Sequence, residues 1–175
     1  MTEQYTQTLE VPTSAQNKAK LIVGIVLMML SLVFLVIGIL KIRWVLIAFG
    51  ALLVIGFVLV QLFESAASEY IYSISPKSFV ISKKNNAHNI KRLVQIDIER
   101  IIRIERFSDI IAPKDIVACE NSGDRNIYAV VFEQEIKYED QTVVKCRRAL
   151  ISPDDYMLAL FAENLGEKYL KEAEN

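Results

Sequence analysis

Two long apolar segments near the start of the chain constrain its fold more than any other feature. Residues 21–40 and residues 44–63 are 20 residues each and contain no Asp, Glu, Lys, Arg or His. At about 1.5 Å rise per residue, each would form a helix of about 30 Å, which is the thickness of the hydrocarbon core of a bilayer. The sequence therefore predicts a two-helix transmembrane hairpin over residues 20–63.

Two other interpretations of these segments fit less well. A buried helix of a small globular protein is usually shorter and keeps a polar stripe, whereas both segments are apolar on every side. A cleavable signal peptide has an apolar core of about 7–15 residues and a small-residue cleavage site. Here Lys41-Ile42-Arg43 follows the first segment instead. We therefore expect the hairpin to be retained as an anchor.

The positions of Lys and Arg predict the orientation of the hairpin. Four lie on the side shared by both chain termini (Lys18, Lys20, Lys77 and Lys83), and two lie in the connecting loop (Lys41 and Arg43). Because cytoplasmic segments carry the excess of Lys and Arg, we expect a multi-pass protein of the cell membrane with both termini cytoplasmic. Two cysteines without metal-like spacing, Cys119 and Cys146, fit a reducing compartment.

Small residues recur at a spacing of seven in the first apolar segment: Gly24, Ser31 and Gly38. This spacing stacks them on one helix face, where small side chains let two helix backbones approach closely. We expect this face to contact the second helix, with its small residues Ala48, Ala51 and Gly56 as candidate contact positions. The alternative is that glycine and serine are simply common in membrane helices. The lack of ionisable residues in both segments argues against a channel or transporter formed by the hairpin alone.

The hairpin divides the rest of the chain into two parts. Residues 1–19 are expected to form a flexible N-terminal tail, and residues 64–175 are enough for one small domain with its own core. Alternating apolar residues predict a series of short strands in this domain, at 69–75, 78–83, 90–98, 102–107, 127–133 and 142–151. Between them, we expect a long loop over 108–126 and a charged turn over 134–141.

The last predicted element is a helix with a recognisable start. Ser152 is the expected N-cap, Pro153 occupies the first helical position, and Asp155 would complete a capping box. Apolar residues then recur at helical spacing: Leu158, Phe161, Leu165 and Tyr169. The sequence thus predicts an α+β domain, a small antiparallel β-barrel or sheet closed by a C-terminal helix.

The strand with Glu69, Tyr70 and Tyr72 directly after the hairpin, the strand SFVIS and the segment IDIERIIRI carry a resemblance. Together they resemble bacterial membrane proteins with a pleckstrin-homology-like domain. They also resemble uncharacterised two-helix membrane families of low-GC Gram-positive bacteria, over about residues 20 to 165. The resemblance implies a pleckstrin-homology-like (PH-like) fold for residues 64–175 and supplies no catalytic residue.

Groups that could carry chemistry are scarce in this chain. The single histidine, His88, lies in a polar turn, where a surface role is expected. Cys146 lies between Lys145 and Arg147, which could lower its pKa, although a plain strand cysteine is the simpler expectation. No phosphate-binding glycine loop, metal motif or nucleophile motif is present. We expect a protein that is not an enzyme, with no cofactor and no metal.

The distribution of charge gives one candidate binding surface. Residues 77–106 contain 8 basic and 3 acidic residues, whereas residues 107–175 contain 8 basic and 14 acidic ones. Four of the basic residues flank one predicted turn and would meet at the same end of a hairpin: Lys83, Lys84, Lys91 and Arg92. Cations close to a membrane surface attract anionic headgroups. A solvated strand face that only keeps the sheet edge soluble is the alternative.

Two functions from different classes fit these observations. The first is a membrane-anchored, non-enzymatic binding module that contacts anionic lipid headgroups or a protein partner. The second is a structural subunit of a larger membrane assembly, in which the hairpin packs with another membrane protein or with copies of itself. A nucleic-acid partner is not expected, because residues 64–175 contain 16 basic and 19 acidic residues.

Overall fold

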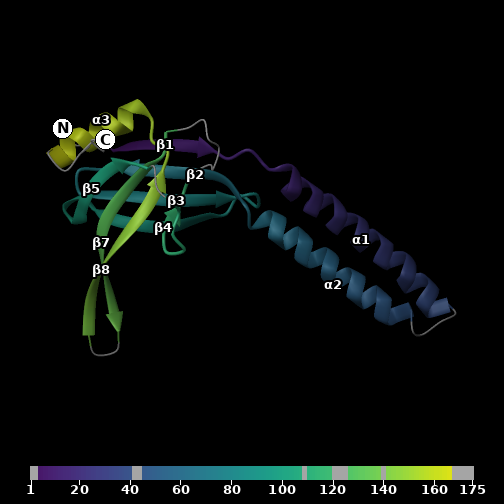
Figure 1. Ribbon diagram of the computed structural model, residues 1–175. Helices are drawn as coiled ribbons and strands as arrows, with labels where there is room; N and C mark the ends of the chain where they lie inside the picture. Colours follow the sequence, from purple (N-terminus) through teal and green to yellow (C-terminus); the bar gives the residue numbers. More distant parts are fainter. Residues whose placement is uncertain (1–3, 41–44, 108–109, 120–125, 139–140, 167–175) are drawn as a thin grey trace. The chain divides into compact units, whose positions relative to one another are not determined.

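Figure 1 shows a computed structural model of the chain, which describes residues 4–40, 45–107, 110–119, 126–138 and 141–166. The chain forms two compact units. The hairpin unit comprises residues 12–68 together with the turn 85–89, and the sheet domain comprises residues 1–11, 69–84 and 90–175. The hairpin unit is thus inserted into the sheet domain, since that domain takes residues from both sides of it.

The hairpin unit contains two long helices that pack side by side, α1 (Ala15–Leu40) and α2 (Val45–Glu64) (Figure 1). Ser14 precedes α1, and its side-chain oxygen accepts a hydrogen bond from the backbone N–H of Asn17 at 3.2 Å, as an N-cap does. Both helices are long and apolar enough to cross a membrane. Large apolar side chains remain exposed along them, including Ile39 at 71% and Ile47 at 65%. The two predicted apolar helices are confirmed.

The first sheet has the strand order β1-β2-β3-β4, formed by β1 (Tyr5–Glu10), β2 (Ala67–Ile74), β3 (Ser78–Asn85) and β4 (Ile90–Asp97). Strand β1 precedes the hairpin unit and pairs antiparallel with β2 over its whole length, from Tyr5 opposite Ile74 to Glu10 opposite Glu69. The expectation of a flexible tail over residues 1–19 is therefore wrong for β1 and for the first turn of α1. Alternation in β1 buries Leu9 and half-buries Tyr5, which gives the strand an inner face.

The second sheet has the order β5-β7-β8-β6, formed by β5 (Ile101–Arg106), β6 (Ile116–Val117), β7 (Tyr128–Tyr138) and β8 (Gln141–Ile151). A short 3-10 helix, η1 (Ile98–Arg100), links β4 to β5. The sheet is mixed, because β6 runs parallel to β8 while the other pairs are antiparallel. Within the described residues, the two sheets do not close into a barrel.

Two predictions for this sheet are wrong. The expected loop over 108–126 contains β6, which pairs with the end of β8 at Ala149 and Leu150. The expected turn over 134–141 is mostly strand, since β7 and β8 remain paired from Glu133 opposite Cys146 to Tyr138 opposite Gln141. Charged residues do not end these strands, because alternate side chains of a two-stranded ribbon can point to solvent.

An ion pair fastens the segment that contains β6. The guanidinium of Arg148 donates to both carboxylate oxygens of Asp115, at 3.1 and 2.9 Å, and the backbone N–H of Ala112 donates to Asp115 at 2.7 Å. The side chain of Asp115 is only 5% exposed. Burial alone would raise the pKa of Asp115, but the hydrogen bonds from Arg148 and Ala112 and the charge of Arg148 outweigh it and lower the pKa.

Helix α3 (Asp155–Leu165) begins two residues later than the predicted cap would place it. The N-cap is Asp154, whose side chain accepts a hydrogen bond from the backbone N–H of Met157 at 2.8 Å. Ser152, the predicted N-cap, is buried instead, and its hydroxyl donates to the backbone oxygen of Asn126 at 3.3 Å. Ser152, Asp154 and Asp155 all lie near this helix start, and Asp154, the first of the two carboxylates, is the one that reaches an unpaired helix N–H.

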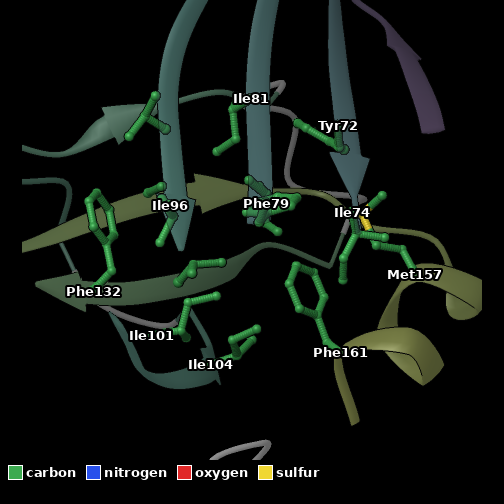
Figure 2. Packing of buried hydrophobic residues seen from close by; sticks show 14 of the residues in the cluster. Tyr72, Ile74, Phe79, Ile81, Ile96, Ile101, Ile104, Phe132, Met157 and Phe161 are labelled. Atoms are coloured by element: carbon green, nitrogen blue, oxygen red, sulfur yellow. The ribbon is translucent and has the colours of Figure 1, made fainter. Parts of the chain in front are cut away.

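The core lies between the inner faces of the sheets and α3 (Figure 2). Met157, Phe161 and Leu165 recur every four residues on α3 and are buried, which confirms Phe161 and Leu165 as inward-facing. Leu158 is only partly buried, and Tyr169 lies outside the described residues. The ring of Phe161 meets the ring of Phe79 edge to face, with 4.9 Å between their centroids. A C-terminal helix packed on strands is thus confirmed.

Candidate functional site

The four predicted cations meet at one end of the β3–β4 hairpin. The strands are antiparallel, with Lys84 opposite Ile90, Lys83 opposite Lys91 and Ser82 opposite Arg92. The register shifts between Ile81 and Ser82, which leaves Leu93 as the extra residue of a bulge. The hairpin thus brings Lys83, Lys84, Lys91 and Arg92 together, as the sequence spacing predicts.

These cations differ in exposure and in their partners. Lys91 and Arg92 are exposed, whereas Lys83 and Lys84 are partly buried. The ammonium group of Lys84 lies 2.7 Å from the carboxylate of Glu69, so its charge is largely balanced within the sheet. Arg92 donates to the side-chain oxygen of Gln95 at 2.6 Å, and this neutral acceptor does not balance its positive charge. Lys91 and Arg92 are therefore the pair best placed to attract an anion.

The turn between the strands is closed by its own backbone and one asparagine side chain. The N–H of Asn85 donates to the backbone oxygen of Asn89 at 3.1 Å, and the N–H of Asn89 donates to the side-chain oxygen of Asn85 at 2.8 Å. His88 adopts a left-handed backbone conformation, with φ of 62°. Asparagine and histidine enter this region more readily than most residues, which suits the sequence NNAHN to a tight turn.

Asn86 joins this turn to the end of α2. Its side-chain amide donates to the backbone oxygen of Phe63 at 2.8 Å, and its backbone N–H donates to the backbone oxygen of Ala66 at 3.1 Å. The hydroxyl of Ser68 donates to the backbone oxygen of Asn85 at 3.1 Å. Carbonyl groups at the end of a helix have no partner within the helix, and Asn86 supplies one. Sequence reasoning missed this role, because an asparagine in a polar turn gives no sign of a partner 23 residues away.

The small residues of α1 lie at the contact with α2. Gly24, Ser31 and Gly38 are all buried, although the large side chains around them are mostly exposed. A Cβ atom on Gly24 would lie 2.9 Å from the backbone oxygen of Gly56, and one on Gly38 would lie 2.7 Å from the side chain of Leu46. Of the three candidate contact positions on α2, Gly56 is buried, whereas Ala48 and Ala51 are exposed.

The described residues offer little chemistry of other kinds. No group of three His, Cys, Asp or Glu among them could hold a metal ion. Burial raises the pKa of the Cys119 thiol to about 11, which opposes formation of a thiolate. An open hollow of about 250 Å³ lies between β4, η1 and β7, and Arg100 bridges Asp97 and Glu135 at its wall, at 3.5 and 3.1 Å. These charges are already paired with one another.

No protein family model, no curated protein and no solved structure matches this chain.

Proposed function

We propose that this chain is a membrane-anchored, non-enzymatic binding module whose β3–β4 hairpin presents cations to anionic lipid headgroups. The observation that carries the proposal is the pair of hydrogen bonds from Asn86 to Phe63 and Ala66. These bonds connect the turn of the β3–β4 hairpin to the end of the apolar helix α2. If α2 spans the bilayer, the turn lies in the headgroup layer, with Lys91 and Arg92 only a few residues away along the chain.

A location in the membrane is supported by the surfaces of α1 and α2. Each helix is long enough to cross the hydrocarbon core, and each keeps large apolar side chains exposed on its surface. Exposed apolar surface of this extent is costly in water and favourable in lipid. The stretch 21–40 of α1 and the stretch 45–63 of α2 contain no ionisable residue.

The pairing of β1 with β2 supports a topology in which both ends of the hairpin lie on one side. Strand β1 precedes α1 and strand β2 follows α2, yet they form one antiparallel ladder. Two strands can only pair on the same side of a bilayer, so a spanning hairpin must return to its starting side. The excess of Lys18, Lys20, Lys77 and Lys83 over the two loop cations then favours the cytoplasm for this side.

A PH-like fold for the sheet domain is part of the proposal. Two packed four-stranded sheets followed by a C-terminal helix agree with the architecture that the sequence resemblance implies. The separation of the sheets and the parallel β6–β8 pair depart from a closed antiparallel barrel. Helix α3 nevertheless covers the core of the domain, since its residues Met157 and Phe161 are fully buried.

Charge reversal in the full-length protein tests this function. The variant Lys91→Glu with Arg92→Glu should retain less phosphatidylglycerol after purification from mixed micelles with phosphatidylcholine, as counted by native mass spectrometry. Each cation near the surface contributes about 1 kcal/mol, so loss of two should weaken retention about 30-fold. Raising the salt concentration should weaken retention by the unmodified chain, because exposed charges are screened.

The matched control is Lys114→Glu with Lys145→Glu. Both of these lysines are exposed in the sheet domain, and the pair changes the net charge by the same amount. We expect the control to retain phosphatidylglycerol as the unmodified chain does. Equal retention by the two charge-reversed variants would contradict the proposed site and favour a protein partner or a structural subunit in its place.

A further inference from the structure

An exposed isoleucine adjoins the basic end of the hairpin. Ile90 is the first residue of β4, directly before Lys91 and Arg92, and 64% of its surface is exposed. It lies opposite Lys84, next to the hydrogen bond between Asn85 and Asn89 that closes the turn. The described residues of the sheet domain leave most of this side chain uncovered, although the other apolar residues of β4 are buried or partly buried.

The position of this turn suggests what covers Ile90. Asn86 is bonded to the backbone oxygens of Phe63 and Ala66 at the end of α2. A helix of 20 residues is about 30 Å long and just crosses the hydrocarbon core, so its last turn lies at the boundary with the headgroups. The headgroup layer on each side is about 5–8 Å thick. A residue one position beyond the turn is within reach of this layer.

We infer that Ile90 inserts its side chain into the interfacial region of the bilayer, so that the β3–β4 turn is a second, shallow membrane contact beside the helical hairpin. Apolar side chains flanked by cations bind this region, because the apolar group enters the acyl boundary while the charges stay at the phosphates. Lys91 and Arg92 follow Ile90 directly and supply those charges. The inference rests on the membrane location given in the proposed function and adds an apolar contact to its electrostatic one.

An environment-sensitive fluorophore at position 90 tests the insertion. In full-length protein with Cys119→Ala and Cys146→Ser, an Ile90→Cys variant is labelled with a nitrobenzoxadiazole probe and reconstituted in vesicles. One set of vesicles contains phosphatidylcholine alone and another adds phosphatidylglycerol. Lipids with a nitroxide near the top of the acyl chain quench only probes that reach this depth. We expect blue-shifted emission and at least about twofold stronger quenching at position 90 than at a control site.

Val144→Cys provides the control. Val144 is also a β-branched strand residue with a similar exposure, 55%, but it lies on β8, which belongs to the second sheet and does not flank the β3–β4 turn. Equal quenching at the two sites, or water-like emission at position 90 in both vesicle types, would overturn the insertion. Quenching at position 90 in both vesicle types would support it even if the charge-reversed variants retain anionic lipid normally. If the charge-reversed variants lose anionic lipid as expected but the probe at position 90 is not quenched, the proposed function stands and the insertion of Ile90 is wrong.

Discussion

The hydroxyl of Tyr5 donates a hydrogen bond of 2.6 Å to the carboxylate of Asp154, 149 residues away in the sequence. The same carboxylate caps α3 through the N–H of Met157. Gln7 reinforces the contact, since its side chain donates to the backbone oxygen of Ser152 at 3.2 Å and accepts from the N–H of Asp154 at 3.0 Å. The strand before the apolar helices thus holds the start of the last helix in place.

Replacing Tyr5 with Phe should destabilise the sheet domain by about 1–2 kcal/mol, because a hydrogen bond to a charged acceptor is lost. The hydrogen bond to Asp154 raises the pKa of Tyr5 above its ordinary value of 10.0, with burial and the charge of Asp154 acting in the same direction. The stability that this bond gives is therefore present below pH 10 and is lost as pH rises through the raised pKa. Chemical unfolding of both proteins should show a difference at pH 7 that shrinks above pH 10. A difference that stays constant with pH would contradict the role of the hydroxyl.

Replacing Gly56 with Leu should loosen the helical hairpin. A Cβ atom there would lie 2.8 Å from the backbone oxygen of Gly24 and 2.8 Å from the side chain of Met28, so the helices must separate. Gly50→Leu on the same helix is the control, because a Cβ atom at Gly50 meets nothing within 4 Å. Thermal unfolding in detergent should show a lower midpoint for the first variant only.

By the same reasoning, Ser31→Leu should lower the unfolding midpoint of the hairpin more than Leu32→Ile, since Ser31 is buried and Leu32 is 58% exposed.

Asp115→Asn should free the segment that contains β6. The variant keeps the size of the side chain but loses the charge that pairs with Arg148, at a cost of about 2–4 kcal/mol for an almost buried carboxylate. Because the pKa of Asp115 is lowered in the folded state, its contribution is present above its ordinary value of 3.8 and is lost as pH falls through the lowered pKa. Unfolding free energies measured at pH 7 and near pH 3 should therefore differ more for the unmodified protein than for the variant. Asp155→Asn, at an exposed site, should change neither value appreciably.

His88→Gly should be neutral or stabilising, because His88 has a left-handed backbone that costs a side-chain residue about 1 kcal/mol. His88→Ile should be destabilising, since β-branched residues enter this region least readily. Comparing the unfolding midpoints of the two variants isolates the backbone effect, because the side chain is exposed. A glycine variant less stable than the isoleucine variant would contradict the turn geometry.

The sequence predicts local elements well and long-range pairings poorly. Two apolar runs, the strand alternation and the spacing of Phe161 and Leu165 are local patterns, and each appears in the fold. Strand β1 was missed because its partner lies beyond the whole hairpin unit, so nothing near Tyr5 indicates a ladder. Likewise, the two residues of β6 are too few to show a period.

The candidate site shows the same division. The register that brings Lys83 opposite Lys91 follows from a turn flanked by two strands, which the sequence displays. The bond from Asn86 to Phe63 and the pairing of Lys84 with Glu69 depend on tertiary packing. These two contacts decide which cations face solvent and where the turn lies, and no local pattern encodes either of them.

The insertion of the helical hairpin into one sheet underlies both the topology and the proposed lipid contact. Cross-linking of β1 to β2 in the reconstituted full-length protein tests this insertion directly. Thr6 lies opposite Ser73, with their hydroxyl oxygens 3.3 Å apart, and directly opposed residues of antiparallel strands have Cα distances that suit a disulfide. Both native cysteines are first replaced, by Cys119→Ala and Cys146→Ser.

Mild oxidation of Thr6→Cys with Ser73→Cys should give an intramolecular disulfide in nearly all molecules, detected as a mobility shift that a reductant reverses. Thr6→Cys with Ser82→Cys is the control, because Ser82 belongs to β3, which is not a neighbour of β1 in the sheet. We expect little cross-linking in that pair. Equal and low cross-linking of the two pairs in vesicles would show that the N-terminal segment does not join the sheet, and would contradict the insertion of the hairpin into a single domain.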